Sequence, residues 1–235
     1  MNVNTTEQIN SIILTQTGQC CLQQLMQEWF EFERRLNKTS IIARLENGRF
    51  TIQDYRSLLL NLRQQVIEGS RWITRCASSF DRHFADVRSI IIAHAKDEHR
   101  DYEILEQDFV AAGGSFGEIQ QAMPNPGTEA LHAFLMHRAT QPNPIDLIGA
   151  MWIIEGLGQK LASHWANRID QLTQGNGDYT RFLRYHGEND ANHMDKLYQL
   201  IDRICQTAAD TRAITRTAAV VGRLYCLQLE EIDNG

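Results

Sequence analysis

The chain has 235 residues, 43% of them hydrophobic, and a formal net charge of −6. An acidic chain offers no basic face to neutralise phosphates, which argues against a nucleic-acid partner, and no apolar run approaches the ~20 residues that a membrane span requires. The N-terminus lacks the basic and apolar regions of a signal peptide, so we expect a cytoplasmic protein without a membrane partner.

The distribution of prolines favours helices. All four prolines fall between residues 124 and 144, so nothing forbids helix over the rest of the chain. Few β-branched runs alternate with polar residues, and we therefore predict an all-α fold. The length is enough to bury a sizeable core in one large domain or two small ones. We predict a single helical domain over residues 1–235, with residues 1–18 as a more loosely packed N-terminal segment.

Two long helices are predicted before residue 80. The second covers residues 51–79 and opens with a capping-box pattern, T-x-x-D. Within it, Glu68 lies away from the buried stripe, so we expect it to pair with Arg75 and keep it only as an outside candidate for a metal ligand. The first helix covers residues 20–37, and its apolar spacing predicts a buried face made of Leu22, Leu25, Met26, Trp29 and Phe30.

The next predicted helix, residues 81–112, carries a first group of polar side chains. His94, Glu98 and Asp101 are spaced i, i+4 and i+7, which places them on one helix face. The helix stops at a Gly-Gly pair, a usual helix end. The same helix face also carries Val87, Ile90, Ile91 and Leu105, so it otherwise looks core-facing. Groups that can ligate a metal therefore interrupt an apolar stripe.

Residues 115–144 are irregular and contain one Glu-x-x-His spacing, Glu129 to His132. It occurs once, near a helix start where Glu is favoured anyway, so we expect no metal there. The helix that follows, residues 143–172, projects Glu155 from a face of apolar and small residues. The alternative role for this carboxylate is a hydrogen bond with a Trp or Tyr donor. Two glycines close to it, which cost about 1 kcal/mol each, predict a close helix approach or a substrate surface.

A second triplet lies on the helix that we predict to begin after Asp178. His186, Asp190 and His193 again have i, i+4 and i+7 spacing. Imidazole and carboxylate together suit iron, manganese or zinc; the alternative is a polar patch that lines a groove or pairs with Arg. Their stripe is otherwise apolar, with Tyr179, Phe182, Leu197, Leu200 and Ile204. A final helix, residues 211–230, completes the bundle.

The energetic cost of burying the acidic groups favours metal. If the three faces meet in one interior, Glu98, Asp101, Glu155 and Asp190 converge there. One uncompensated buried polar group costs about 2 to 7 kcal/mol, against a total stability of about 5 to 15 kcal/mol. Either cations neutralise these groups or the site is wet. Three imidazoles and up to four carboxylates match two iron ions, with Mn or Zn as substitutes, and oversupply a single zinc.

The motif His186-x3-Asp190-x2-His193, together with Glu155 upstream, resembles that of the heme-oxygenase-like di-iron oxidases and oxygenases. These proteins are structurally related to TenA-type thiaminases and to pyrroloquinoline-quinone synthase. The similarity covers about residues 50–205 and implies a bundle of seven to eight helices. It also implies that these four residues ligate two weakly bound Fe(II) ions.

This chain departs from the family pattern on its first ligand helix. The family usually offers a carboxylate and then a histidine, whereas here the order is His94, Glu98 and Asp101. Asp101 takes the usual histidine position, and His94, one turn earlier, is a candidate to compensate. Which of the three bind metal, and whether both iron sites are filled, stays open.

The resemblance implies an iron- and O2-dependent oxidoreductase that uses an electron donor to oxidise a small organic substrate of amino-acid, fatty-acid or aromatic type. A homodimer is left open as its assembly. A metal-free enzyme of the TenA or pyrroloquinoline-quinone synthase kind is the first alternative and would place Cys205 or Cys76 in the pocket as a nucleophile. The second is a non-catalytic helical binding protein. Five cysteines without C-x-x-C spacing fit a reducing compartment, and Cys76, Cys205 and Cys226 look like small core residues.

Overall fold

The computed structural model describes residues 14–234, except for the side chains of residues 189–193. This part of the chain is helical and contains no β-strand, which confirms the all-α prediction. None of its helices is long and apolar enough to cross a membrane. Its α-helices are α1 (Gln16–Leu36), α2 (Ser40–Glu46), α3 (Ile52–Ser79), α4 (Ala85–Glu98), α5 (Tyr102–Ala111), α6 (Phe116–Gln121), α7 (Pro126–Ala139), α8 (Ile148–Leu157), α9 (Ser163–Thr173), α10 (Arg181–Ile204) and α11 (Ala208–Glu230).

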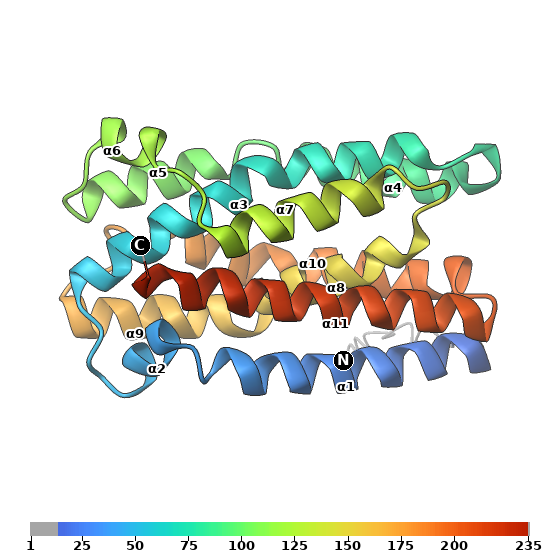
Figure 1. Ribbon diagram of the computed structural model, residues 1–235, viewed down its shortest axis with the longest axis horizontal. Helices are drawn as coiled ribbons and strands as arrows, with labels where there is room; N and C mark the ends of the chain where they lie inside the picture. Colours follow the sequence, from blue (N-terminus) through green and yellow to red (C-terminus); the bar gives the residue numbers. More distant parts are fainter. Residues whose placement is uncertain (1–13, 235) are drawn as a thin grey trace, which may run out of the picture.

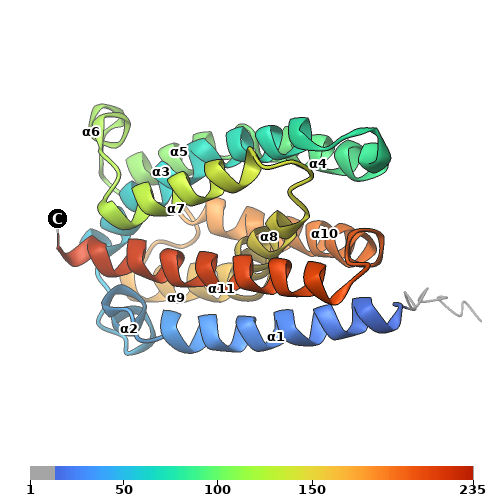
Figure 2. The same cartoon turned by 45° about the vertical axis from the view of Figure 1, so that its right-hand side comes forward.

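The long helices run roughly side by side along the longest axis of the molecule (Figure 1). α1 and α11 pack together along one side, and the turned view shows the same pairing (Figure 2). On the opposite side, α3 packs against both α4 and α7, and α8 lies between the two sides in contact with both α10 and α11. The helices of the described residues are more numerous than the seven to eight expected, because two predicted rods are divided and α2 was not predicted.

The buried face of α1 differs from the predicted one. Met26 and Phe30 are 46% and 59% exposed, so their assignment to the core was wrong. Each follows a buried residue by one position, which is about 100° around the helix. Leu25 and Trp29 were predicted correctly. The stripe that packs into the core consists of Cys21, Leu25, Trp29, Phe32 and Leu36.

Side-chain caps set the starts of several helices. α3 begins where the sequence predicts, because Thr51 and Asp54 form a reciprocal capping box. A second capping box at Thr207 starts α11 three residues earlier than expected. Asp178 does not cap α10, which is preceded by Thr180 instead.

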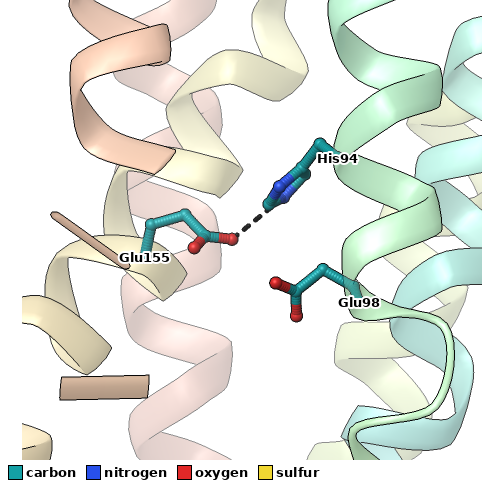
Figure 3. Close-up of side chains that lie close together, drawn as sticks. All are labelled: His94, Glu98 and Glu155. Atoms are coloured by element: carbon teal, nitrogen blue, oxygen red, sulfur yellow. Dashed lines mark ion pairs between the residues drawn. The ribbon is translucent and has the colours of Figure 1, made fainter. Parts of the chain in front are cut away.

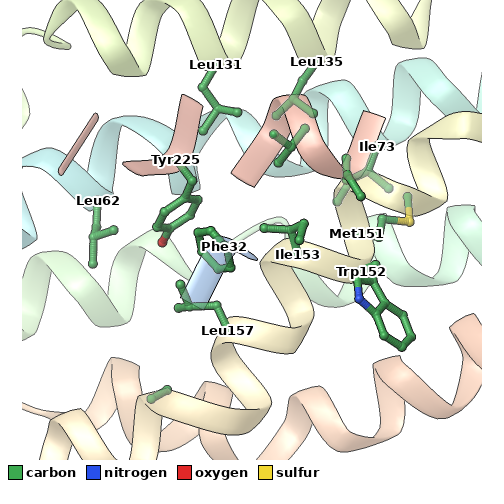
Figure 4. Packing of buried hydrophobic residues seen from close by; sticks show 14 of the residues in the cluster. Phe32, Leu62, Ile73, Leu131, Leu135, Met151, Trp152, Ile153, Leu157 and Tyr225 are labelled. Carbon is green, nitrogen blue, oxygen red and sulfur yellow. The ribbon is translucent and has the colours of Figure 1, made fainter. Parts of the chain in front are cut away.

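One continuous hydrophobic core fills the space between the helices (Figure 4). Cys76, Cys205 and Cys226 are buried in it, as predicted. A buried carboxylate, that of Asp146, links helices across the core: its Oδ2 accepts hydrogen bonds from Arg138 on α7 and from Thr217 on α11 at 2.8 and 2.6 Å. At the N-terminal end, the segment predicted as loosely packed lies outside the described residues up to position 13.

Candidate metal centre

The first ligand helix is shorter than predicted. Instead of one rod over residues 81–112, α4 ends at Glu98, and three non-helical residues separate it from α5. Asp101, the last of the three, keeps helical dihedral angles, with φ −65° and ψ −24°. His94 and Asp101 are both buried. The break therefore leaves all three candidate residues of this segment together.

Glu155 projects from α8 just before a helical irregularity. Residues Gly158–Ala162 form a π-helical turn that joins α8 to α9. Such turns are rare in proteins, and those that occur are often found at functional sites. The two glycines close to Glu155, Gly156 and Gly158, have different roles. A side chain at position 156 would come within 2.9 Å of the ring of Trp29, which marks a close helix approach. Gly158 instead lines the cavity described below.

α10 contributes His186 from a stripe that is apolar as predicted. The ring of Phe182 lies 4.5 Å from the His186 ring, centroid to centroid, and Leu197 is buried further along the helix. The side chains of Asp190 and His193, the other two predicted ligands on this helix, lie outside the described residues.

The side chains from α4, α8 and α10 meet around Glu98. Glu155 reaches across from α8 to α4, with its Oε1 3.0 Å from His94 Nε2 (Figure 3). On the other side, His186 Nε2 lies 3.6 Å from Asp101 Oδ2. Two groups of donors result, one of His94, Glu98 and Glu155, the other of Glu98, Asp101 and His186. Within each group the donor atoms all lie within 4.8 Å of one another.

The charges in this cluster perturb one another. Burial and then the neighbouring charge of Glu155 raise the pKa of Glu98 from 4.5 to about 7, against the opposing effect of the two histidines. For His94, burial lowers the pKa, but the hydrogen bond and charge of Glu155 outweigh it and the net pKa is raised. Cationic charge placed between these carboxylates would stabilise their ionised forms.

The other sequence candidates lie outside both donor groups. Glu68 pairs with Arg71 at 2.7 Å rather than with Arg75, because positions i and i+3 adjoin on a helix. His132 Nε2 lies 3.7 Å from the Glu68 carboxylate, and Glu129 is exposed at the start of α7. The Glu-x-x-His spacing therefore does not bring its two residues to the cluster.

A cavity of about 90 Å³ adjoins the cluster. Glu98, Glu155 and His186 form part of its wall, and the remainder is largely apolar and aromatic. The sequence alone did not predict this cavity, because its lining residues come from six helices and the π turn and meet only in the folded chain. Its other lining residues are Leu62, Gln65, Val66, Gly69, Trp72, Ile73, Ile154, Leu157, Gly158, Ala162, Trp165, Phe182, Leu183 and Tyr225.

The fold is similar to that of several solved structures. A domain of unknown function with a heme oxygenase-like fold from Shewanella denitrificans superposes with a TM-score of 0.81 at 17% identity, covering 95% of this chain and 94% of that one. A TenA homologue from Pseudomonas syringae pv. tomato gives 0.76 at 12% identity, covering 92% and 93%. A TenA homologue from P. horikoshii gives 0.67 at 13% identity, covering 94% and 98%.

These likenesses establish a heme-oxygenase-like, TenA-like fold. At such low identity they establish the fold alone. No protein-family model matches the sequence, and no curated protein is significantly similar to it.

Proposed function

We propose that this protein is a non-heme di-iron oxidase or oxygenase that uses O2 to oxidise a small organic substrate. One observation carries the proposal: the carboxylate of Glu98 belongs to two separate groups of potential metal ligands. A carboxylate has two oxygens and can bind one ion with each. A glutamate shared between two donor groups suits a pair of neighbouring ions.

The donor set fits iron. His94 and Glu155 lie on one side of Glu98, while Asp101 and His186 lie on the other. Each group offers one imidazole and carboxylate oxygens, a combination that suits iron, with manganese or zinc as substitutes. Each group also falls short of a full coordination shell, which leaves positions for further ligands, O2 or substrate.

Asp190 and His193 are the further ligands in this proposal. The sequence places them four and seven residues after His186 on α10, and the resemblance to di-iron oxidases implies that they bind metal. Together with the five clustered residues they give the full set of seven candidate ligands.

Two iron(II) ions bound here would supply electrons for the reduction of O2, and an external electron donor would restore them. The chain itself holds the ligands in place through buried helices. The apolar cavity beside Glu98 and His186 would bind the substrate next to the metals and exclude bulk water from them. The proposal includes a cytoplasmic location, which the five free cysteines support. It leaves a homodimer open.

The metal-free alternative of the TenA kind is less well supported. It requires a cysteine nucleophile in the cavity beside a glutamate. Neither Cys205 nor Cys76 is among the described residues that line the 90 Å³ cavity. Cys76 lies in a separate, smaller cavity, and burial raises the pKa of its thiol, which disfavours the reactive thiolate. A simple binding protein would have no need for converging carboxylates in its interior.

The decisive experiment is an anaerobic titration of the metal-free protein with Fe(II), followed by Mössbauer spectroscopy. The proposal predicts that two ions bind per chain and that both are oxidised after O2 is admitted. His186→Ala should remove one of them, while His132→Ala, a histidine outside both groups, should leave both in place. Binding of a single ion or none by the parent protein would refute a di-iron centre.

A further inference from the structure

A glycine in the middle of α3 leaves space beside the cavity. Gly69 is an interior residue of a 28-residue helix, where glycine is less favourable than alanine. A Cβ at this position would meet no described atom within 4 Å, so packing between helices does not require the glycine. Because Gly69 lines the 90 Å³ cavity, the effect of the missing side chain is to keep that cavity wide.

The cavity wall away from Glu98, Glu155 and His186 is neutral. It consists of aliphatic side chains and aromatic rings, among them Leu62, Ile73, Leu157 and Tyr225 (Figure 4). Its polar groups include the amide of Gln65 and the phenol of Tyr225. Burial raises the pKa of Tyr225, so this phenol stays protonated and uncharged.

None of the described residues that line this cavity is Lys or Arg, and the sequence has neither in residues 1–13 or 189–193. Basic residues on α7, α10 and the π turn are engaged elsewhere. Arg138 pairs with Asp146 and Arg184 with Asp170, while Lys160 lies over the ring of Trp29. Lys196 lines a different cavity of about 10 Å³ and lies 3.5 Å from an Asp97 oxygen.

We propose that the cavity binds a neutral, apolar molecule about the size of one aromatic ring or a short alkyl chain, and that Gly69 sets the size limit. A charged group placed against the apolar wall would lose its hydration without gaining a partner, which is unfavourable. In the metal-free protein an anion would also meet the carboxylates of Glu98 and Glu155. The volume is of the same order as the ~150 Å³ apolar cavity that accepts benzene. This inference takes the cavity as the substrate site of the proposed oxidase.

The test compares two probes that share a ring and differ in charge. Benzyl alcohol and benzoate are titrated into the metal-free protein, and again after addition of Zn(II), a redox-inert ion. Binding is measured by ligand-observed NMR and by the tryptophan emission of the protein, to which Trp72 and Trp165 in the cavity wall contribute. We expect benzyl alcohol to bind at least about tenfold more tightly than benzoate in both forms, a difference of about 1.4 kcal/mol.

Three variants test the size limit. Gly69→Phe should fill the cavity and weaken benzyl alcohol binding at least about tenfold. Gly69→Ala should fold normally and bind nearly as well as the parent. Gly117→Phe is the matched control, since position 117 also has no described atom within 4 Å of an added Cβ but lies on exposed α6. It should leave binding unchanged. Circular dichroism checks that each variant is folded.

The inference would be overturned if benzoate bound as tightly as benzyl alcohol or more tightly, with or without Zn(II). It would also be overturned if neither probe bound. A folded Gly69→Phe variant that binds benzyl alcohol like the parent would also overturn it. If this variant does not fold, the comparison of probes in the parent protein still decides. Because these measurements need no iron, a protein that prefers benzyl alcohol but takes up no Fe(II) would refute the oxidase proposal and leave this inference standing.

Discussion

Glu98→Gln should remove both metal ions at once, because this residue belongs to both donor groups. Glutamine keeps the size of the side chain but carries no negative charge and offers a single acceptor oxygen. We expect metal content, measured by plasma mass spectrometry after anaerobic loading with Fe(II) or Mn(II), to fall from two ions per chain toward none. Replacement of a ligand present in only one group should leave one ion.

The same substitution should stabilise the metal-free protein. Burial first, and then the charge of Glu155, raise the pKa of Glu98 from 4.5 to about 7. A shift of this size corresponds to about 3 kcal/mol of destabilisation once the group is ionised, at 1.36 kcal/mol per unit. The buried amide retains part of the desolvation cost. We therefore expect Glu98→Gln to raise the free energy of unfolding by about 1 to 3 kcal/mol at pH 8.

Urea denaturation at pH 8 in the presence of a chelator measures this difference. Glu103→Gln is the control, since it removes an equal charge from a carboxylate that pairs with Arg100 near the surface. Its effect should stay within about 0.5 kcal/mol. A Glu98→Gln variant that still binds two ions would show that Glu98 is not shared. If both proteins are free of metal and the Glu98→Gln variant is less stable than the parent, the charge of Glu98 is already compensated in the parent.

Three further substitutions test the fold around the site. Gly149→Ala should destabilise the protein by about 1 to 3 kcal/mol, because the added Cβ would lie 2.1 Å from the carbonyl oxygen of Ile214. Urea denaturation measures this loss of stability, and an unchanged midpoint would contradict the close packing of α8 on α11. Asp146→Asn should lower the Tm, because an amide replaces a buried carboxylate that accepts two hydrogen bonds. The expected shift is about 2–4 °C for each kcal/mol of unfolding free energy that is lost. Calorimetry measures the shift, and an unchanged Tm would mean that these hydrogen bonds contribute nothing to stability. Glu68→Gln should leave metal content unchanged in the same plasma assay, and a loss of iron would bring Glu68 into the centre.

Spacing along the sequence predicted that candidate side chains lie close together but not how they are arranged. The i, i+4, i+7 pattern placed His94, Glu98 and Asp101 on one side, and the structure keeps them together although the helix ends at Glu98. The sequence could not show that Glu98 would stand between the other residues. That position depends on how α4, α8 and α10 pack in space, and no local pattern encodes it.

Helix ends and faces were predictable only where local chemistry determines them. The capping box at Thr51 fixed the start of α3 because its hydrogen bonds involve residues three apart. The face of α1 was misassigned because apolar residues occupy two neighbouring stripes, and only packing against α11 selects Phe32 over Phe30. The cavity required the complete fold, since Gly69 and Gly158 lie far apart in the chain and line the same space.

The π-helical turn after Glu155 contains one residue more than an α-helical turn of the same length would need, since its hydrogen bonds join residues five apart rather than four. A descendant chain that lost a single residue between positions 158 and 162 could restore an ordinary helix while α8 and α9 kept their partners. Its bundle would survive, but the wall that Gly158 and Ala162 give to the cavity would be redrawn. In this architecture a one-codon deletion is a route by which the shape of the cavity can diverge without loss of the scaffold.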